Sequence, residues 1–343
     1  MKRFRLARGL VVGWFLWAFL SQALAFDGID QPGKNTYRAV LTSDNDSIAL
    51  FNSDRFYTNG LKLTLSHNSQ NQAPIWLQTM GQWLPWFPDH QSTRHAYTIG
   101  QSMFTPEDIA TASLLPFDRP YAGWLYATAD LATRQDNQFD ALSISIGIVG
   151  PYSQAEQSQK FVHQLIGAQD PKGWNNQLDN AVGVNLAYQR SWRIVEIQRN
   201  QHSLFDLTPY ASGALGTVYR YLGTGINLRY GPHLADDYGV PKLQFGLPIT
   251  HSIALSAAKS FSWYIFSGIE VRYVEYNYFL HGNNALTRQI QIQPNPWIGQ
   301  LQAGVVFNWP RFSLTLNQMF QTKEYTSQVR AHNIGALSFS LKY

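Results

Sequence analysis

The sequence contains no cysteine, and only 14% of its 343 residues are charged, where about a quarter is usual in soluble domains. Without cysteine the chain can form neither disulfide bonds nor a thiolate metal site. After residue 25 it also has no apolar run of about 18 residues, the length that a membrane-spanning helix needs. These three shortages exclude a disulfide-stapled secreted domain, a thiolate metalloprotein and a helical membrane protein.

The first 25 residues have the pattern of a secretory signal peptide. A basic start is followed by an apolar run over 10–24 and by a small-x-small pattern at 23–25. We therefore expect cleavage before Phe26, rather than a membrane anchor, and a single domain over 26–343. Removing the four basic residues of this leader from the 26 Lys and Arg leaves 22, which equals the 22 Asp and Glu. The mature chain is then formally neutral, so we expect no nucleic-acid partner.

The sequence is instead rich in aromatic residues and in segments where apolar and polar residues alternate. Aromatic residues reach 14%, with 11 Trp and 18 Tyr. Near the C-terminus Leu337, Phe339 and Leu341 alternate with Ser338 and Ser340, the period of a strand with one apolar face. Similar segments lie near 36–46, 57–68, 94–104, 120–134, 138–149, 181–198, 205–220, 222–231, 262–280, 297–309, 311–324 and 332–343.

These twelve segments predict an all-β fold: a 12-stranded antiparallel transmembrane β-barrel in the bacterial outer membrane, with both termini in the periplasm. A soluble sandwich or lipocalin-like barrel would explain the alternation, but not the low charge or the many Trp and Tyr. A closed barrel leaves no sheet edge to pair, so we expect a monomer.

One segment breaks the alternation and has the period of a helix. It covers 153–166, and Ser153 precedes Glu156 by three residues, the spacing of a capping box. Glu156, Gln159 and His163 share one helical face. We predict one short α-helix, in an extracellular loop or in the barrel lumen, that presents His163.

Several motifs lie along the chain in order. They are NDS at 45–47, DRFYTNG at 54–60, GQSMFTPED at 100–108, DRPYAGW at 118–124, GIVGPYSQAEQSQKFVHQLIG at 147–167, PKGWNNQLDN at 171–180 and FLHGN at 279–283. Together they resemble the lipid A 3′-O-deacylase (LpxR-like) family of outer-membrane barrels. The resemblance implies an active site between the barrel wall and the loop helix. It also implies an esterase that removes the 3′-acyloxyacyl chain of lipid A, the lipid part of lipopolysaccharide.

The resemblance also assigns roles to residues. A histidine would activate water, and a divalent cation, expected to be Ca²⁺, would stabilise the oxyanion. By motif the catalytic residues are His163, Asn45, Asp46 and Thr58. The chemistry is consistent, because histidine titrates near neutral pH and a hard cation prefers oxygen ligands. Asp46 would either orient the imidazolium or bind the cation, Asn45 would be an oxyanion donor or a cation ligand, and Thr58 shares the parity of the lumen-facing Lys62.

The sequence departs from the family pattern in two places. Six residues after the helix histidine the family has a glutamate, and here that position is Gln169, followed by Asp170. Gln169 and Asp170 therefore join Asp46 as candidate cation ligands. The basic residues of characterised members between the third and fourth strands are also missing, and Glu107 and Asp108 lie there instead.

Other motif residues have a structural interpretation. We expect Asp118 and Arg119 to pair across neighbouring strands near the barrel rim, and Asp54 and Arg55 to do the same. The aromatic residues Tyr121, Trp124 and Tyr126 are expected in the girdle at the membrane interface, and Trp174 is expected to pack its loop under the helix.

Two alternative functions stay open. The protein could be a phospholipase-type esterase that acts on another membrane lipid. It could also be a non-enzymatic barrel, a porin or a structural protein, in which the helix is a plug. A serine hydrolase has no support, because no serine lies in a Gly-x-Ser-x-Gly elbow.

Overall fold

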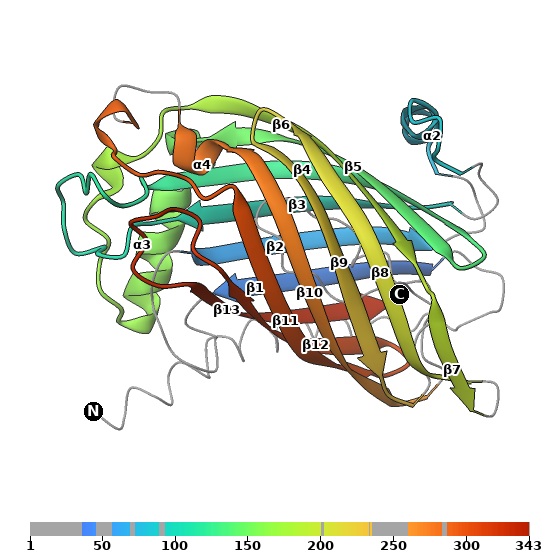
Figure 1. The fold of residues 1–343 in the computed structure, drawn as a ribbon. Helices are drawn as coiled ribbons and strands as arrows, with labels where there is room; N and C mark the ends of the chain where they lie inside the picture. Colours follow the sequence, from blue (N-terminus) through green and yellow to red (C-terminus); the bar gives the residue numbers. More distant parts are fainter. Residues whose placement is uncertain are drawn as a thin grey trace.

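The computed structural model describes residues 36–45, 57–68, 73–88, 93–199, 202–232, 234, 260–282 and 287–342. Thirteen strands within these ranges form one antiparallel sheet (Figure 1). They are β1 (Thr36–Asn45), β2 (Tyr57–Asn68), β3 (Thr93–Phe104), β4 (Ala122–Gln135), β5 (Gln138–Val149), β6 (Ala181–Trp192), β7 (Val195–Arg199), β8 (His202–Gly216), β9 (Tyr219–Tyr230), β10 (Ser262–Asn277), β11 (Trp297–Asn308), β12 (Phe312–Gln321) and β13 (His332–Lys342).

Twelve of these strands close into a barrel. β1 pairs with β13, and β6 pairs with β8. The predicted 12-stranded antiparallel barrel is thus confirmed. The segment expected as one strand over 181–198 is two strands, because β8 pairs first with the short β7 and then with β6. β7 is the extra thirteenth strand, and it extends the wall at one end.

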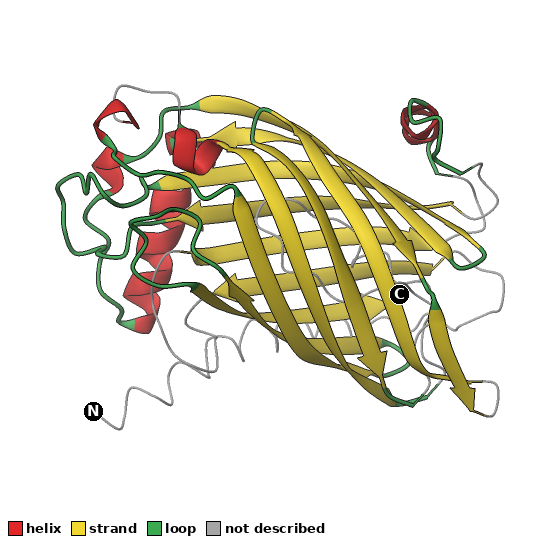
Figure 2. Ribbon diagram, viewed as in Figure 1, coloured by secondary structure: helices red, strands yellow, loops and turns green. Residues whose placement is uncertain are grey.

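Short helices lie at both ends of the barrel (Figure 2). They are the α-helices α2 (Ile75–Gln82), α3 (Ala155–Ile166) and α4 (Tyr278–His281), and the 3-10 turns η2 (Pro151–Ser153), η3 (Trp174–Asn176) and η4 (Thr287–Gln289). α3 is the helix that the sequence predicts, but α2 and α4 were not predicted. Among the described residues, none of the helices has the length and apolar character needed to cross a membrane.

The two ends of the barrel differ. One end carries α3 and α4, and the other carries α2 (Figure 1). The first and last described residues, Thr36 and Lys342, both lie at the α2 end, because Thr36 pairs with Asn68 and Lys342 with Arg38. We call these the α3 end and the α2 end.

The strand alternation separates an apolar outer wall from a polar lumen. Leu61 and Leu63 of β2 are exposed on the outside, whereas Thr64 is buried inside, where its hydroxyl bonds that of Thr98 at 2.8 Å. Lys62 also points inward and forms an ion pair with Asp44 of β1 at 3.2 Å, as its parity predicts. This alternation is typical of membrane-spanning barrels.

Aromatic side chains fill the lumen near the α3 end. Trp124 is fully buried and stacks on Tyr126 at 4.4 Å, and Phe104 stacks on Phe279 at 4.3 Å. The prediction that Trp124 and Tyr126 belong to an interfacial girdle is therefore wrong. Both share the parity of the inward-facing Thr128 on β4, so the sheet turns them away from the membrane.

A buried ionic cluster closes the rim above these rings. Arg119 forms an ion pair with Glu324 at 3.1 Å, and His332 bonds the same carboxylate at 2.9 Å. Asp118 accepts hydrogen bonds from the Glu107 amide at 2.8 Å and from the Tyr325 hydroxyl. Arg119 thus forms an ion pair near the rim as expected, but its partner Glu324 is on the loop between β12 and β13 rather than on a neighbouring strand. Asp118 has a structural role through hydrogen bonds. Asp54 and Arg55 lie outside the described residues.

Candidate active site

α3 packs against the outside of the barrel wall, beside β3 and β4. Gly123 of β4 permits the close approach: a Cβ there would lie 2.2 Å from the Ser153 hydroxyl and 2.3 Å from the Ala155 Cβ. Gly123 has the parity of the exposed Leu125, so this contact is on the outer face. Met103 of β3 packs in the same buried cluster as Ala155. Small residues at the wall therefore place the helix at the membrane side of the rim.

The start of α3 differs from the predicted capping box. Ser153 ends the 3-10 turn η2, and its hydroxyl donates to the Gly150 carbonyl at 2.6 Å. The N-cap is Gln154, in the left-handed conformation with φ 58°, and its side chain makes no capping bond. A different contact ties this turn to the wall: the Gln101 amide on β3 donates to the Ser153 carbonyl at 2.6 Å.

The loop after α3 holds the helix from its other side. The Trp174 indole N–H donates to the buried Gln159 Oε1 at 2.7 Å, and Trp174 packs against Tyr121 at 4.9 Å. The expected packing of Trp174 under the helix is confirmed, and Tyr121 belongs to this buried contact rather than to an exposed girdle. Gln159 lies one turn before His163, so these contacts fix the face that carries the histidine.

The backbone of the turn that ends α3 contacts His163. Gly167 has φ 65°, and the Ala168 amide donates to the His163 carbonyl at 2.8 Å. The Gln169 carbonyl then lies 2.5 Å from Nδ1 of the His163 ring. A carbonyl oxygen only accepts hydrogen bonds, so Nδ1 carries the proton, and neutral His163 has its lone pair on Nε2. Among the described residues none bonds Nε2.

The structure places Asn45 at the end of β1, opposite Gly335 of β13. Because Asp44 points into the lumen, the alternation puts Asn45 on the outer face, the face that carries α3. Asp46 follows directly and lies outside the described residues.

Thr58 is the extra residue of a β-bulge in β2. Tyr57 pairs with Phe104 and Asn59 with Met103, so no residue of β3 lies opposite Thr58. A bulge interrupts the alternation of faces, so parity counted from Lys62 does not fix the face of Thr58, and its lumen-facing position stays a prediction.

The axis of α3 runs along the strand ends from β4 towards β1 (Figure 1). His163 lies eight residues after Ala155, which is about 12 Å along a helix. Strands are about 4.8 Å apart, so the same distance along the wall leads from β4 past β2. The His163 end of α3 therefore extends towards the ends of β2 and β1, and no hydrogen bond joins His163 to Asn45 within the described residues.

Two of the three candidate cation ligands, Gln169 and Asp170, lie within the described residues. The described residues contain no group of three or more His, Asp or Glu that could hold a metal ion. Gln169 and Asp170 are exposed beside His163 and offer an amide and a carboxylate oxygen, the donors that Ca²⁺ prefers. Their chemistry fits such an ion, with Asp46 as the further candidate. Asp108 instead accepts bonds from the Ala110 amide and the Thr111 hydroxyl of its own loop.

Sequence comparison decides the family. The model of the family "Outer membrane protein LpxR" matches residues 11–343. The chain belongs to this family. It is thus an outer-membrane β-barrel that crosses the membrane many times.

A solved structure supports the fold. LpxR from Salmonella typhimurium superposes with a TM-score of 0.74 at 18% identity, over 89% of this chain and 99% of that one. The β domain of the Bordetella autotransporter BrkA has a TM-score of 0.42 at 8% identity, over 91% and 99% of the two chains. An outer membrane channel from Pseudomonas putida F1 has a TM-score of 0.42 at 10% identity, over 92% and 98%. No curated protein matches the sequence.

Several residues that build the site were not predicted as such. Gly123 and Gln101 hold α3 to the wall, and the Gln169 backbone orients His163. Gly123 lies in the DRPYAGW motif and Gln101 in GQSMFTPED, so the motifs contained the signal. Nothing in the sequence indicates that the Gln169 carbonyl contacts His163, because every residue has a backbone carbonyl.

Proposed function

We propose that this LpxR-family barrel is an esterase that hydrolyses the 3′-acyloxyacyl ester of lipid A at the rim between α3 and the outer wall. The observation that carries the proposal is the bond between His163 Nδ1 and the Gln169 carbonyl. It orients the ring and leaves Nε2 as the basic nitrogen, the arrangement that general-base catalysis needs.

The reaction would proceed in two steps. Nε2 of His163 takes a proton from water as the water oxygen attacks the ester carbonyl, which gives a tetrahedral oxyanion. The oxyanion then collapses and the C–O bond to the sugar breaks, while the imidazolium returns its proton to the leaving alkoxide. The products are the free acyloxyacyl acid and the 3′-hydroxyl of lipid A.

Other residues would support the charges that develop. The Gln169 carbonyl stabilises the imidazolium through its hydrogen bond with Nδ1–H. The Asn45 amide would donate to the oxyanion, and Thr58 would help to position the ester. A Ca²⁺ ion held by Asp46 with Gln169 or Asp170 would supply positive charge next to the oxyanion.

The location of the site supports a lipid substrate. α3 lies on the membrane side of the wall, so a lipid can reach His163 laterally from the outer leaflet. Phe161 and Leu165 of α3 are 62% and 48% exposed, and they offer an apolar surface to acyl chains. The porin alternative has less support, because Trp124, Tyr126 and Phe279 fill the lumen at this end.

Mass spectrometry of lipid A tests the proposal. Lipid A from cells that express the protein should lack the 3′-acyloxyacyl group, and lipid A from cells that express His163→Ala should retain it. His202→Ala is the matched control, because His202 lies on β8 at the α2 end, away from α3. Unchanged lipid A despite a folded barrel would refute the proposal, and release of fatty acid from phospholipids instead would establish the phospholipase alternative.

A further inference from the structure

α2 lies outside the barrel, at the end opposite to α3 (Figure 1). Its Leu77 and Met80 are buried, and they form one apolar cluster with Leu131 of β4 and Leu142 of β5. Leu131 shares the parity of the exposed Leu125, so α2 covers the outer face of the wall. The helix is therefore attached to the membrane-facing surface rather than to the lumen.

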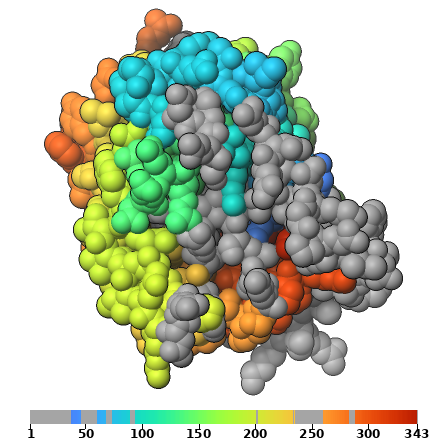
Figure 3. Space-filling view, turned by 90° about the vertical axis from the view of Figure 1, so that its right-hand side faces the viewer, coloured from blue at the N-terminus to red at the C-terminus, as the bar shows by residue number. Residues whose placement is uncertain are grey.

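The other face of this segment is apolar as well. Residues 73–88 contain no charged side chain. Trp76, Trp83 and Trp86 are 52%, 71% and 54% exposed, and Ile75 is 81% exposed. Figure 3 looks onto this end of the barrel, where the light-blue atoms of this segment form the upper rim. Uncharged segments with exposed tryptophans are typical of the interface between lipid headgroups and acyl chains.

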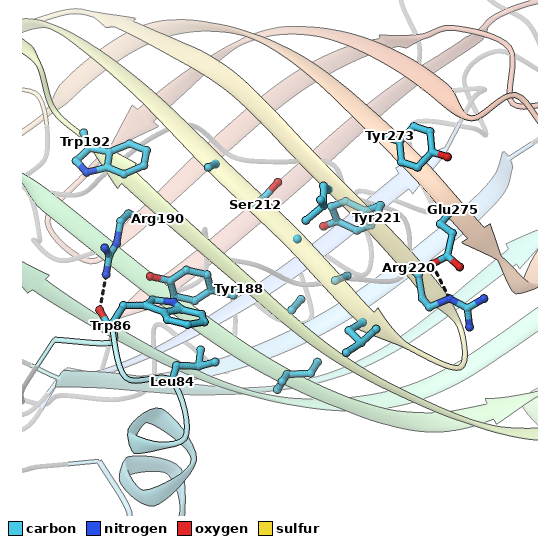
Figure 4. A pocket seen from close by; sticks show the side chains of 17 residues that line it. Leu84, Trp86, Tyr188, Arg190, Trp192, Ser212, Arg220, Tyr221, Tyr273 and Glu275 are labelled. Atoms are coloured by element: carbon cyan, nitrogen blue, oxygen red, sulfur yellow. Dashed lines mark hydrogen bonds and ion pairs between the residues drawn. The ribbon is translucent and has the colours of Figure 1, made fainter.

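A groove of about 920 Å³ begins at this segment and crosses the outer wall (Figure 4). Leu84 and Trp86 form one end, and Tyr273 of β10 lies at the other, near the Arg220–Glu275 ion pair. Between them the floor passes over Ala211 and Gly213 of β8, where small side chains lower the wall. The volume is within the usual range of small-molecule sites.

The wall of the groove at Trp86 is held in place. The Arg190 guanidinium donates to the Trp86 carbonyl at 2.5 Å and, through Nε, to the buried Asp140 carboxylate at 2.7 Å. The Tyr188 hydroxyl also donates to Asp140, and its ring meets the Trp86 indole edge to face at 6.4 Å. A charged pair on a membrane-facing wall is costly unless it is covered, and Trp86 and Tyr188 provide the cover.

We propose that this groove binds an acyl chain of a phospholipid, with the headgroup at the α2 end. The groove lies on the outer face of an outer-membrane barrel, so hydrocarbon meets the apolar lining between Trp86 and Tyr273. Both described chain ends lie at the α2 end, which in such barrels faces the periplasm, and the periplasmic leaflet consists of phospholipid. The tryptophans of residues 73–88 lie at the depth where that headgroup begins.

Filling the floor tests the proposal. Ala211→Phe places a ring in the groove, and Ala127→Phe is the matched control, because Ala127 is equally exposed on β4 outside the groove. Each variant is purified in detergent, incubated with palmitoyl-oleoyl-phosphatidylethanolamine and measured by native mass spectrometry. We expect the unaltered protein and Ala127→Phe to retain one phospholipid more than Ala211→Phe does.

A second measurement uses the tryptophans themselves. Phosphatidylethanolamine with brominated acyl chains should quench fluorescence more in the unaltered protein than in Ala211→Phe, and Trp86→Phe should remove most of that difference. Heat-dependent gel migration confirms that each barrel is folded. Equal phospholipid retention and equal quenching of tryptophan fluorescence in all variants would refute the proposal. A dimer mass that Ala211→Phe abolishes would also refute it, because a second copy of the protein would then fill the groove. None of these outcomes depends on lipid A hydrolysis.

Discussion

Nδ1 of His163 lies 2.5 Å from the backbone carbonyl of Gln169, and this contact does not depend on the side chain at position 169. The family resemblance predicts a glutamate at this position, where the sequence has glutamine, but the backbone acceptor that orients the histidine is the same for either residue. The replacement can act only through the side chain, and therefore on the cation or on the substrate. The backbone carbonyl of Gln169 thus sets the orientation of the base, and the side chain affects the charge of the site, so the two effects can be tested independently.

The turn at Gly167 should control the orientation of the base. Its φ of 65° disfavours a side chain, although a Cβ there would meet nothing within 4 Å. Gly167→Val should therefore move the Gln169 carbonyl and lower kcat about tenfold, with little change in KM. Gly167→Asn should recover most of the activity, because asparagine tolerates this conformation. Time courses of lipid A deacylation give both constants, and equal activity of the two variants would contradict the prediction.

The side chain of Gln169 should set the cation requirement. After treatment with EDTA, activity is titrated against Ca²⁺ for the unaltered protein, Gln169→Ala and Gln169→Glu. We expect the half-maximal Ca²⁺ concentration to rise about tenfold in Gln169→Ala and to fall in Gln169→Glu, because a ligand is lost or gains charge. Asp170→Asn shows whether the neighbouring carboxylate contributes. Full activity in EDTA would exclude the cation from the mechanism.

The barrel could be predicted from the sequence because its signal is local. Leu61, Leu63 and Thr64 show their faces by alternation alone, and an outer-membrane barrel needs little more than such strands and their pairing. Alternation gives parity but not direction, however. The outer wall and the lumen at the α3 end are both lined by apolar and aromatic side chains, so alternation did not show on which side Trp124 and Tyr126 lie.

The site was predicted less completely, because it is assembled from distant segments. His163 was found through its helix, and Trp174 through its motif. The bulge at Thr58 was invisible, since nothing in a strand pattern shows which residue lacks a partner. The capping box at Ser153 was wrong because its hydroxyl donates to the Gly150 carbonyl and the helix begins one residue later, after Gln154, which spacing alone does not show.

Gly123 should be essential for the position of α3 but not for the barrel. Gly123→Leu would meet the Ser153 hydroxyl and Ala155, whose atoms lie 2.2 Å and 2.3 Å from an added Cβ. We expect the helix to leave the wall and deacylation to fall at least a hundredfold, as about 3 kcal/mol of lost positioning would give. Gly299→Leu is the control, because its nearest neighbour is the Thr322 methyl at 3.4 Å. Retained activity in Gly123→Leu would show that catalysis does not need α3 at the wall.

The ionic cluster at the rim should make the α3 end sensitive to acid. Burial alone would raise the pKa of Glu324, but Arg119, His332 and Arg272 outweigh it and lower the pKa to about 2 from an ordinary value of 4.5. A carboxyl with a depressed pKa stabilises the folded state fully above its unfolded-state pKa, and this contribution is lost as the pH falls from about 4.5 to about 2. The melting temperature in detergent should fall across this window.

The Glu324→Gln variant supplies the comparison. It leaves Arg119 buried without its carboxylate, so the free energy of unfolding at pH 7 should drop by about 3 to 5 kcal/mol. Its melting temperature should then change less between pH 4.5 and pH 2 than that of the unaltered protein. Glu275→Gln is the matched control, because the Arg220–Glu275 pair is exposed on the wall and contributes little. Parallel melting curves for the unaltered protein and Glu324→Gln across that window would show that another group governs acid sensitivity.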